Sequence, residues 1–395
     1  MLTEMSKIKS FYFNRTIKNM FGSDYITISR INKEKKEVLA SSIIPKFINR
    51  LDKPYIYHSI PIKKQYKSKT GSKKILRENL YFINITKFEH QILPEGFPKT
   101  TVIGCKSLIK ESKHGKIRYA KMFPGGTFEV LRNSPVRIRW GIGYSNIIKM
   151  YFHGLEKPEI PEAEISEGNI QKYNNNLIPA VYWYQAKEKE GKSKVYNGPT
   201  GFYLIKANKD QLYNLRHVDF PGEKYIYPLI IQDCSFYTDG SFVLPDRNKL
   251  FFGDAIMVNG KVWPNLNVER RQYRFYILNA SYSRVYNLKL SNGMDFILVG
   301  RERGLLPSPV KTKEFLLAPG ERADVLIDFS RIPTGTKIIL INDAKTPYPD
   351  GDLPEPETTG QIMRFTVPEN EILSVAPMRL PDKFYDNSRL DSIPK

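Results

Sequence analysis

The residues of this chain with the chemistry of metal ligands or nucleophiles are five histidines and two cysteines. The histidines stand singly in the sequence, at His58, His90, His114, His153 and His217. A metal site needs several donors at fixed spacing, so an isolated histidine is more often a structural or surface residue. Cys105 and Cys234 are far apart and have no histidine neighbours. They predict neither a metal site nor a redox pair, and they do not call for an oxidising compartment.

Other sequence patterns that carry chemistry are missing as well. The chain has no glycine-rich phosphate loop, no nucleophile elbow and no acidic cluster at metal spacing. The run Gly300–Gly304 is predicted to be an ordinary loop. Arg322 and Asp324 are two residues apart on a predicted strand and could pair as a structural contact. We therefore predict no catalytic residue from these patterns.

The elements around these residues are predicted to be strands, and residues 253–290 show the pattern most clearly. Ala255–Val258 is an apolar run, and Asn259-Gly260 is a typical two-residue hairpin turn before the return strand Lys261–Trp263. Arg271–Leu278 alternates with period two, and its face of Arg271, Tyr273, Phe275 and Ile277 is the more apolar.

The remaining chain repeats this pattern of short strands and turns. Further predicted strands are Leu80–Ile85, Thr127–Leu131, Val136–Trp140, Tyr182–Lys187, Gly198–Ile205, Tyr227–Asp233, Arg284–Leu290 and Gly360–Val367. Polar segments at 206–222 and 343–359 separate them. The sequence predicts an all-β protein with sandwich-type strands.

Three long runs carry a resemblance to a known family. They are KMFPGGTFEVLRNSPVRIRW at 121–140, VNGKVWPNLNVERRQYRFYILNASYSRVYNLKL at 258–290 and FLLAPGERADVLIDF at 315–329. They resemble the multicopper oxidases, in particular spore-coat laccases and bilirubin oxidases, from about Pro124 to about Val367. The resemblance implies two cupredoxin-like Greek-key β-sandwich domains, at 79–206 and 223–367, joined by a connector at 207–222 and followed by a tail at 368–395. The family's third domain should follow and is not seen, so we expect the first two domains only.

In that family a type-1 copper is held by one cysteine and two histidines, and a trinuclear cluster by eight histidines. The family's HLHG run corresponds here to Tyr151–Gly154, and its WYHDH run to Trp183–Lys187. The resemblance implies that Tyr151, Gln185 and Lys187 replace copper ligands and that His153 alone remains. A lysine ammonium repels a metal ion and has no lone pair to donate. We expect no cofactor, and we expect these four residues to form one polar cluster on two facing strands.

The net charge of +20 is concentrated at the N-terminus, where residues 1–80 hold 18 Lys and Arg against 6 Asp and Glu. We predict a basic, partly disordered extension at 1–78. It is either a solvated arm or an arm that binds an anionic partner such as RNA, an acidic protein or a lipid surface. Residues 1–23 have a composition that permits a mitochondrial or other organellar presequence, and no secretory or membrane-spanning run is seen, which favours an intracellular location.

Three functions are weighed on these grounds. The first is a catalytically degenerate multicopper-oxidase-like protein that acts as a structural or partner-binding subunit, with a protein partner over the face of domain 1 that the third domain covers in the family. The second is a laccase-like, copper-dependent oxidoreductase that needs a third domain from another chain. The third is a basic subunit of a nucleic-acid-containing assembly.

Overall fold

The structure is a computed structural model that describes residues 36–67, 73–110, 116–143, 148–155, 170–188, 198–207, 220–246, 249–302 and 304–384. The described chain is almost entirely β, as predicted, with two short 3₁₀ turns, η1 (Ser41–Ile43) and η3 (Glu223–Tyr225). The first ten strands are β1 (Ile60–Lys67), β2 (Lys73–His90), β3 (Thr100–Lys110), β4 (Ile117–Met122), β5 (Phe128–Leu131), β6 (Val136–Ile142), β7 (Ile148–His153), β8 (Ile170–Tyr173), β9 (Ala180–Glu188) and β10 (Thr200–Lys206).

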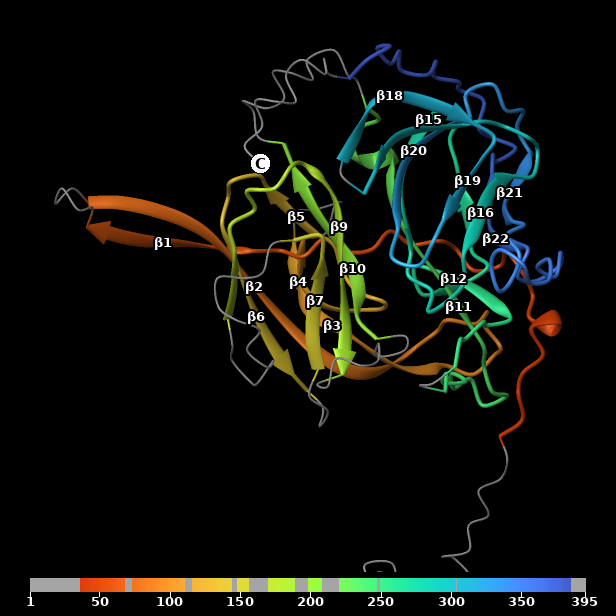
Figure 1. Cartoon of the computed structure of the whole chain (residues 1–395), viewed down its shortest axis with the longest axis horizontal. Coiled ribbons are helices and arrows are strands. Elements are labelled where there is room, and N and C mark those ends of the chain that lie inside the picture. Colours follow the sequence, from red (N-terminus) through yellow and green to blue (C-terminus); the bar gives the residue numbers. More distant parts are fainter. Residues whose placement is uncertain are drawn as a thin grey trace, which may run out of the picture.

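Twelve further strands follow in the second half of the chain. They are β11 (Ile226–Cys234), β12 (Ala255–Val258), β13 (Lys261–Val262), β14 (Asn265–Asn267), β15 (Gln272–Asn279), β16 (Tyr286–Leu290), β17 (Phe296–Arg301), β18 (Gly304–Thr312), β19 (Glu314–Leu317), β20 (Arg322–Asp328), β21 (Lys337–Asn342) and β22 (Gln361–Thr366). The strands form two bodies side by side (Figure 1), and in each body two sheets face one another.

The first β-sandwich consists of β1–β10. One sheet has the order β4-β3-β2-β6-β8 with β1 paired to β2, and the other has the order β5-β10-β9-β7. Side chains that alternate along the strands fill the space between the sheets, and Phe128, Trp140, Tyr184 and Tyr203 are almost completely buried there. Val136, Ile138 and Trp140 alternate along the predicted strand 136–140, and all three lie in this core.

The second β-sandwich consists of β11–β22, in sheets ordered β13-β12-β11-β15-β20-β17-β18 and β14-β22-β21-β16-β19. The predicted hairpin between β12 and β13 is present, and Asn259 and Gly260 have φ angles of 50° and 77°. Two consecutive positive φ angles match the right-handed twist of a hairpin, which explains the Asn-Gly pair. The predicted apolar face of β15 is confirmed, with Tyr273, Phe275 and Ile277 buried in the second core.

The opposite face of β15 meets the first sandwich. Leu278 packs in one buried cluster with Val181, Trp183, Phe202 and Leu204, which lie on β9 and β10. Tyr182 and Tyr184 alternate with these residues and point into the first core. The outer face of the sheet β5-β10-β9-β7 is therefore partly covered by the second sandwich, and residues at odd positions of β9 belong to that face.

The described part of the predicted N-terminal extension differs from a separate arm. We call residues 36–59 the N-terminal strap, because this segment crosses both sandwiches. Leu39, Ile44 and Leu51 are buried in the second core, and Tyr57 is buried in the first, where its hydroxyl lies 2.9 Å from that of Tyr184. These apolar anchors are widely spaced and have no periodic pattern, so the sequence did not show them as part of a core.

The described part of residues 61–74, a stretch within the predicted partly disordered extension, is also different. Most of it forms the antiparallel β1–β2 pair, in which Ile60 lies opposite Leu80 and Lys67 opposite Lys73. This pair projects from the first sandwich as a ribbon (Figure 1). The many charged residues of this stretch make its strands hard to recognise from sequence. Residues 1–35, including the stretch proposed as a presequence, lie outside the described residues.

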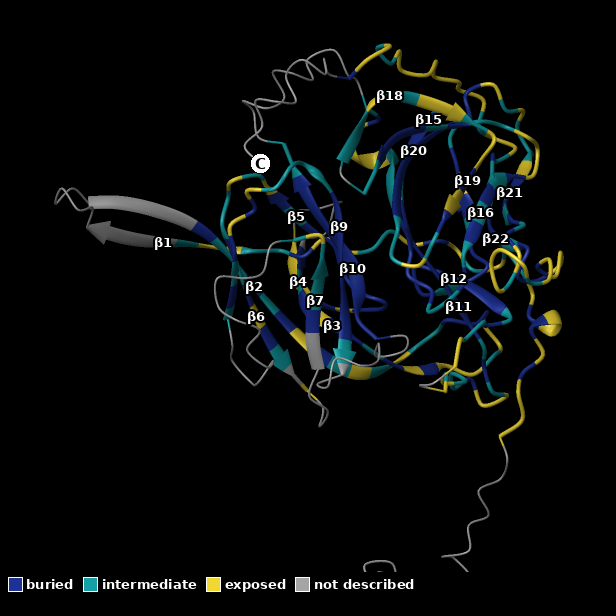
Figure 2. Cartoon of the chain, viewed as in Figure 1, coloured by how far each residue is buried: buried dark blue, intermediate teal, exposed yellow. Residues whose placement is uncertain are grey.

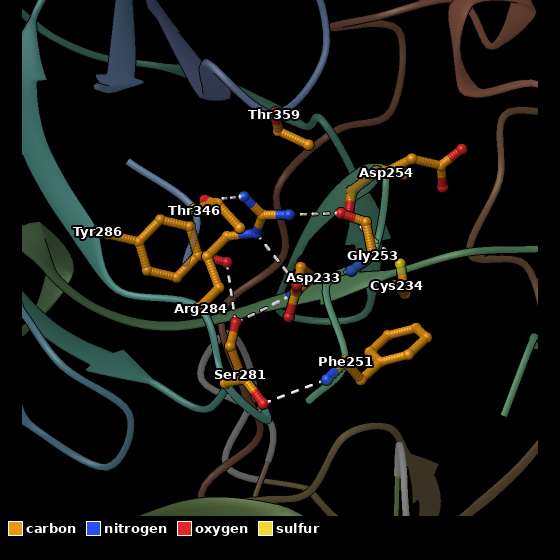
Figure 3. Close-up of polar contacts among 12 residues, drawn as sticks. Asp233, Cys234, Phe251, Gly253, Asp254, Ser281, Arg284, Tyr286, Thr346 and Thr359 are labelled. Atoms are coloured by element: carbon orange, nitrogen blue, oxygen red, sulfur yellow. Dashed lines mark hydrogen bonds and ion pairs between the residues drawn. The ribbon is translucent and has the colours of Figure 1, made fainter. Parts of the chain in front are cut away.

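One buried ion pair stabilises the second sandwich (Figure 3). The Asp233 side chain is fully buried on β11, and its Oδ2 accepts hydrogen bonds from Arg284 Nε at 3.0 Å and from the Gly253 backbone N–H at 2.8 Å. Arg284 also donates to the Gly253 carbonyl oxygen and to Thr346 Oγ1. Each partner of the charge pair is thus hydrogen-bonded several times, as a buried charge requires.

The predicted C-terminal tail is described as far as residue 384. Phe384 is buried in a small cluster with Val299 and Leu326, so the tail returns to the second sandwich, while Ile372 and Leu373 are about four-fifths exposed. Figure 2 shows that buried residues follow the facing sheets of both bodies. Within the described ranges, no helix has the length and apolar character that crossing a bilayer would require.

Candidate functional site

The four residues singled out by the resemblance lie on two neighbouring strands of the first sandwich. In the antiparallel β7–β9 pair, Tyr151 lies directly opposite Gln185, and His153 lies opposite Trp183. Lys187 follows Gln185 by two residues, so it lies on the same face of β9. This face is the outer one, because Tyr184 and Ala186 between them point into the core.

His153 and Gln185 are in direct contact. The Gln185 side-chain amide nitrogen lies 2.7 Å from His153 Nε2 and donates to it when that ring nitrogen carries no proton. The His153 ring stacks on Trp183, with ring centroids 3.9 Å apart and an angle of 11° between the planes. The imidazole is therefore fixed by a stacking partner on one side and by an amide at one nitrogen.

Tyr151 and Lys187 form a second contact beside the first. The Lys187 ammonium lies over the Tyr151 ring, with Nζ 4.4 Å from its centroid. This is a cation–π geometry, in which the negative face of the ring attracts the positive charge. The four side chains thus form two adjacent contact pairs on one face. Their correspondence to copper-ligand positions stays a prediction.

A pocket of about 730 Å³ opens beside this face. His153, Trp183 and Gln185 line it from the first sandwich, and Glu302 and Arg322 line it from the second. Arg322 pairs with Glu302 and donates to the Val181 carbonyl oxygen at 3.1 Å. Burial raises the pKa of the Glu302 carboxyl and lowers the pKa of Arg322, because it disfavours the charged form of both groups.

The predicted pairing of Arg322 with Asp324 is wrong. Asp324 instead pairs with Arg274, whose Nε and Nη2 lie 2.8 Å and 2.6 Å from its two carboxylate oxygens. Residues two apart on a strand are about 7 Å apart along it. Side chains from neighbouring strands come closer, and Arg322 and Asp324 each pair with a residue across from their own strand.

The remaining histidines and cysteines do not gather into a site. His58 and His90 lie on separate segments, and His114 and His217 lie outside the described residues. Among the described residues, no group of three or more His, Cys, Asp or Glu has the geometry of a metal site. Cys105 and Cys234 are unpaired and buried, and burial raises the pKa of the Cys105 thiol to about 12. Neither thiol is poised for reaction at neutral pH.

The residues at the predicted copper positions do not fit copper. His153 offers imidazole, a good copper ligand, but its Nε2 lone pair is used by the Gln185 amide. The Lys187 ammonium would place a positive charge against the metal. Tyr151 directs its ring face toward that ammonium. This set of side chains differs from the set of imidazoles that the family resemblance implies for a copper cluster, and it does not provide the ligands for one.

The class of protein is defined by the fold and by this face. The chain forms two cupredoxin-like β-sandwiches, and the candidate site lies on the outer face of one sheet of the first sandwich, where the second sandwich partly covers it. No family model matches the chain. Comparisons with individual proteins are more informative.

The chain is 35% identical to a laccase of Bacillus subtilis (strain 168) over 302 residues, which cover 63% of this chain and 56% of that protein. It is 41% identical to multicopper oxidase LPR1 of Arabidopsis thaliana over 212 residues, or 49% of this chain and 35% of that protein. Among solved structures it resembles a multicopper oxidase of Pediococcus acidilactici, with a TM-score of 0.65, 20% identity and coverage of 90% of this chain and 66% of that one.

A second solved structure gives the same result. The McoA multicopper oxidase 2F4 variant from Aquifex aeolicus has a TM-score of 0.64 and 22% identity, and the match covers 86% of this chain and 68% of that one. The chain thus spans about half or less of the length of the curated relatives it matches. It is similar in sequence to part of a multicopper oxidase over up to 63% of its own length, and similar in fold over 86–90% of it.

Proposed function

We propose that the chain is a catalytically degenerate multicopper-oxidase-like protein whose role is structural or partner-binding. The observation that carries this proposal is the contact between Gln185 and His153 Nε2, together with the cation–π pair of Tyr151 and Lys187. Through these contacts the four side chains interact with one another in two pairs. A site built for metal would instead leave several lone pairs directed at one point.

The partner surface that we propose is the exposed part of the face that carries these residues. Among the described strands, β7 ends its sheet, so one edge of its backbone is available for hydrogen bonding. An available edge strand is a template for a strand of another chain. The second sandwich covers the part of the face near Trp183. A protein partner at β7 would cover the adjoining part near Tyr151.

Copper content tests the loss of copper chemistry. We expect the purified protein to bind no stoichiometric copper and to oxidise neither phenols nor bilirubin. If copper and oxidase activity appear when a co-purified chain is present, the protein is instead one part of an oxidoreductase assembled from two chains. A blue absorption band in the protein alone would contradict the proposal outright.

Restoring the ligands is a sharper test of the same point. The variant carries histidine at three positions, Tyr151→His, Gln185→His and Lys187→His. We expect at most weak copper binding and no turnover, because the described residues supply no further cluster ligands near this face. Turnover by this variant alone would refute the reasoning. The single variant Lys187→Met is the control, since it removes the charge without adding a donor.

Photo-crosslinking tests the partner surface. A photoreactive residue at position 151, which is half-buried on this face, is expected to capture a protein from the native host extract. The same residue at position 337, which is exposed on the second sandwich, is the control. Identification of one protein captured at 151 and not at 337 supports the proposal. Equal capture at both positions, or none at 151, contradicts it.

A second function is favoured by the β1–β2 ribbon. The strand register places Lys63 opposite Arg77 and Lys67 opposite Lys73 in a projecting ribbon. Lysines and arginines on a projecting ribbon would neutralise the phosphates of a nucleic acid without reading its sequence. Substituting these four residues by glutamine is expected to abolish salt-dependent RNA binding and to leave folding intact. Deleting residues 1–80 would not be a clean test, because the strap anchors both cores. Unchanged binding by the glutamine variant rules out this role for the ribbon.

A further inference from the structure

A second pocket lies where the N-terminal strap crosses between the two sandwiches. It measures about 320 Å³ and is lined by segments far apart in the sequence. Asp52–Tyr55 comes from the strap, and His90 ends β2. Residues 121–125 span the end of β4 and the segment after it, Asn259 lies in the turn of the β12–β13 hairpin, and Lys261 begins β13. The pocket therefore exists only when the strap and both sandwiches are in place, which is why no local sequence pattern predicts it.

The charges in this pocket are mainly positive. Lys53, Lys121 and Lys261 line it, and Asp52 is the single carboxylate in the lining. Lys261 Nζ donates to the Gln91 carbonyl oxygen at 2.7 Å, which engages one of its three N–H donors. Lys121 is exposed, and its ammonium lies 5.5 Å from the centroid of the Phe88 ring. Two ammonium groups therefore retain donors that can be directed at a ligand.

Lys53 is held more firmly than the other two lysines. Its Nζ donates to the carbonyl oxygens of Glu223 and Lys224 at 3.0 Å and 2.7 Å and lies 4.1 Å from the centroid of the Tyr227 ring. It therefore contributes charge to the pocket more than hydrogen bonds. That charge acts on a ligand at longer range than the two other ammonium groups.

Burial makes the positive charge of this pocket costly. It lowers the pKa of Lys53 to about 8, and it also lowers the pKa of Lys261. His90 has a pKa lowered to about 4, by burial first and then by the charge of Lys261, so its ring is neutral at pH 7. His90 Nε2 is buried and has no hydrogen-bond partner. The other charges that face these groups are Asp52 and Glu95 near Lys261, and Glu223 and Lys224 near Lys53.

We propose that this pocket binds a small oxyanion, with the chemistry of phosphate or of a phosphate monoester. Lys121 and Lys261 would donate to its oxygens, and Lys53 would add to the field. The volume lies at the lower end of the range for small-molecule sites, which suits a compact anion. A bound anion would link the strap to both sandwiches, so binding would stabilise the folded chain. This site is separate from the face of Tyr151 and Lys187 and does not depend on the proposed function.

Calorimetry and thermal unfolding with inorganic phosphate test the proposal, with potassium chloride at equal ionic strength as the reference. We expect saturable binding and a rise in melting temperature. The double variant Lys121→Met/Lys261→Met is expected to bind at least ten-fold more weakly. Lys337→Met/Lys345→Met is the matched control, because it removes two charges from exposed positions of the second sandwich and should change the affinity less than two-fold.

A second variant keeps the test decisive if the first one unfolds. Asp52 is exposed, so Asp52→Asn is expected to fold and to bind phosphate a few-fold more tightly, because it removes the one carboxylate of the lining. Binding should also take up protons at pH 8, since an anion raises the pKa of a neighbouring lysine. The same titration with glycerol phosphate distinguishes the two kinds of ligand. Tighter binding of glycerol phosphate than of inorganic phosphate indicates a phosphate monoester, and equal binding indicates the free ion. No saturable binding, or equal binding by the double variant, overturns the proposal.

Discussion

Replacing Arg284 by methionine should strongly destabilise the second sandwich. Arg284 and Asp233 are 4% and 0% exposed in their side chains, and the pair is joined at 3.0 Å. Methionine keeps much of the aliphatic volume but removes the charge and the donors to Asp233, Gly253 and Thr346. A buried carboxylate left without its partner costs about 3–5 kcal/mol. For a unit of this size, that corresponds to a fall in melting temperature on the order of 10 °C.

The same variant should show a distinctive dependence on pH. Burial raises the pKa of Asp233 above its ordinary value, and Arg284 opposes that rise. Without Arg284 the folded-state pKa rises further, so the folded variant binds a proton more tightly than the unfolded chain does. Stability then falls as pH rises through the interval between the unfolded and folded pKa values. We therefore expect the destabilisation of Arg284→Met to be smaller at pH 5 than at pH 8.

Urea unfolding followed by tryptophan fluorescence measures this effect, because Trp263 is completely buried in the second core. The informative control is the double variant Asp233→Asn/Arg284→Met, in which the pair is replaced by neutral groups. It should recover most of the lost stability, since a neutral amide pays no cost for a buried charge. The reasoning is refuted if the single variant loses less than about 1 kcal/mol or if the double variant is no more stable than the single one.

Three further predictions concern the β12–β13 hairpin turn, the N-terminal strap and Lys53. Gly260→Ala should lower the free energy of unfolding by about 2 kcal/mol, because φ is 77° and an added Cβ would lie 2.7 Å from the Phe123 carbonyl oxygen. The control is Gly293→Ala, where φ is 71° and the space around the added Cβ is open, and it should lose about 1 kcal/mol. Thermal unfolding measures both. Leu51→Ala should cost about 2–5 kcal/mol in denaturant unfolding, and a loss below about 1 kcal/mol would show that the strap does not anchor the second core. The pKa of Lys53 is lowered from 10.5 to about 8 in the folded chain, so between these pH values the unfolded chain binds more protons than the folded chain. Stability should therefore rise with pH in that window. Lys53→Met should remove this part of the rise.

Recognition of the fold from sequence depended on local patterns with a clear period. The Asn259-Gly260 turn, the alternation of Tyr273, Phe275 and Ile277, and that of Val136, Ile138 and Trp140 each specify a strand by themselves. The positions of the four marked residues on β7 and β9 came from the family resemblance, whose HLHG and WYHDH runs correspond to Tyr151–Gly154 and Trp183–Lys187. Side chains on one face of a strand can be grouped without knowing what the strand packs against.

Other features depend on long-range packing and could not be read locally. The strap looked like an extension because Leu39, Ile44 and Leu51 lie in short apolar groups without a strand or helix period, and their role is shown only by the core that receives them. The partners of Arg322 and Asp324 were chosen by distance across strands. Glu302, which lines the pocket beside His153, comes from a different sandwich and carries no signal in the sequence.

The sequence by itself determined the class of fold and the identity of the side chains at the four marked positions, because residue type and strand period are local properties. The tertiary structure alone decided what those side chains do. It brought the Gln185 amide to His153 Nε2 and the Lys187 ammonium over Tyr151, and it assembled Lys53, Lys121 and Lys261 around one pocket from three distant segments. Such contacts depend on distances across strands and between sandwiches, which are fixed only when the cores pack.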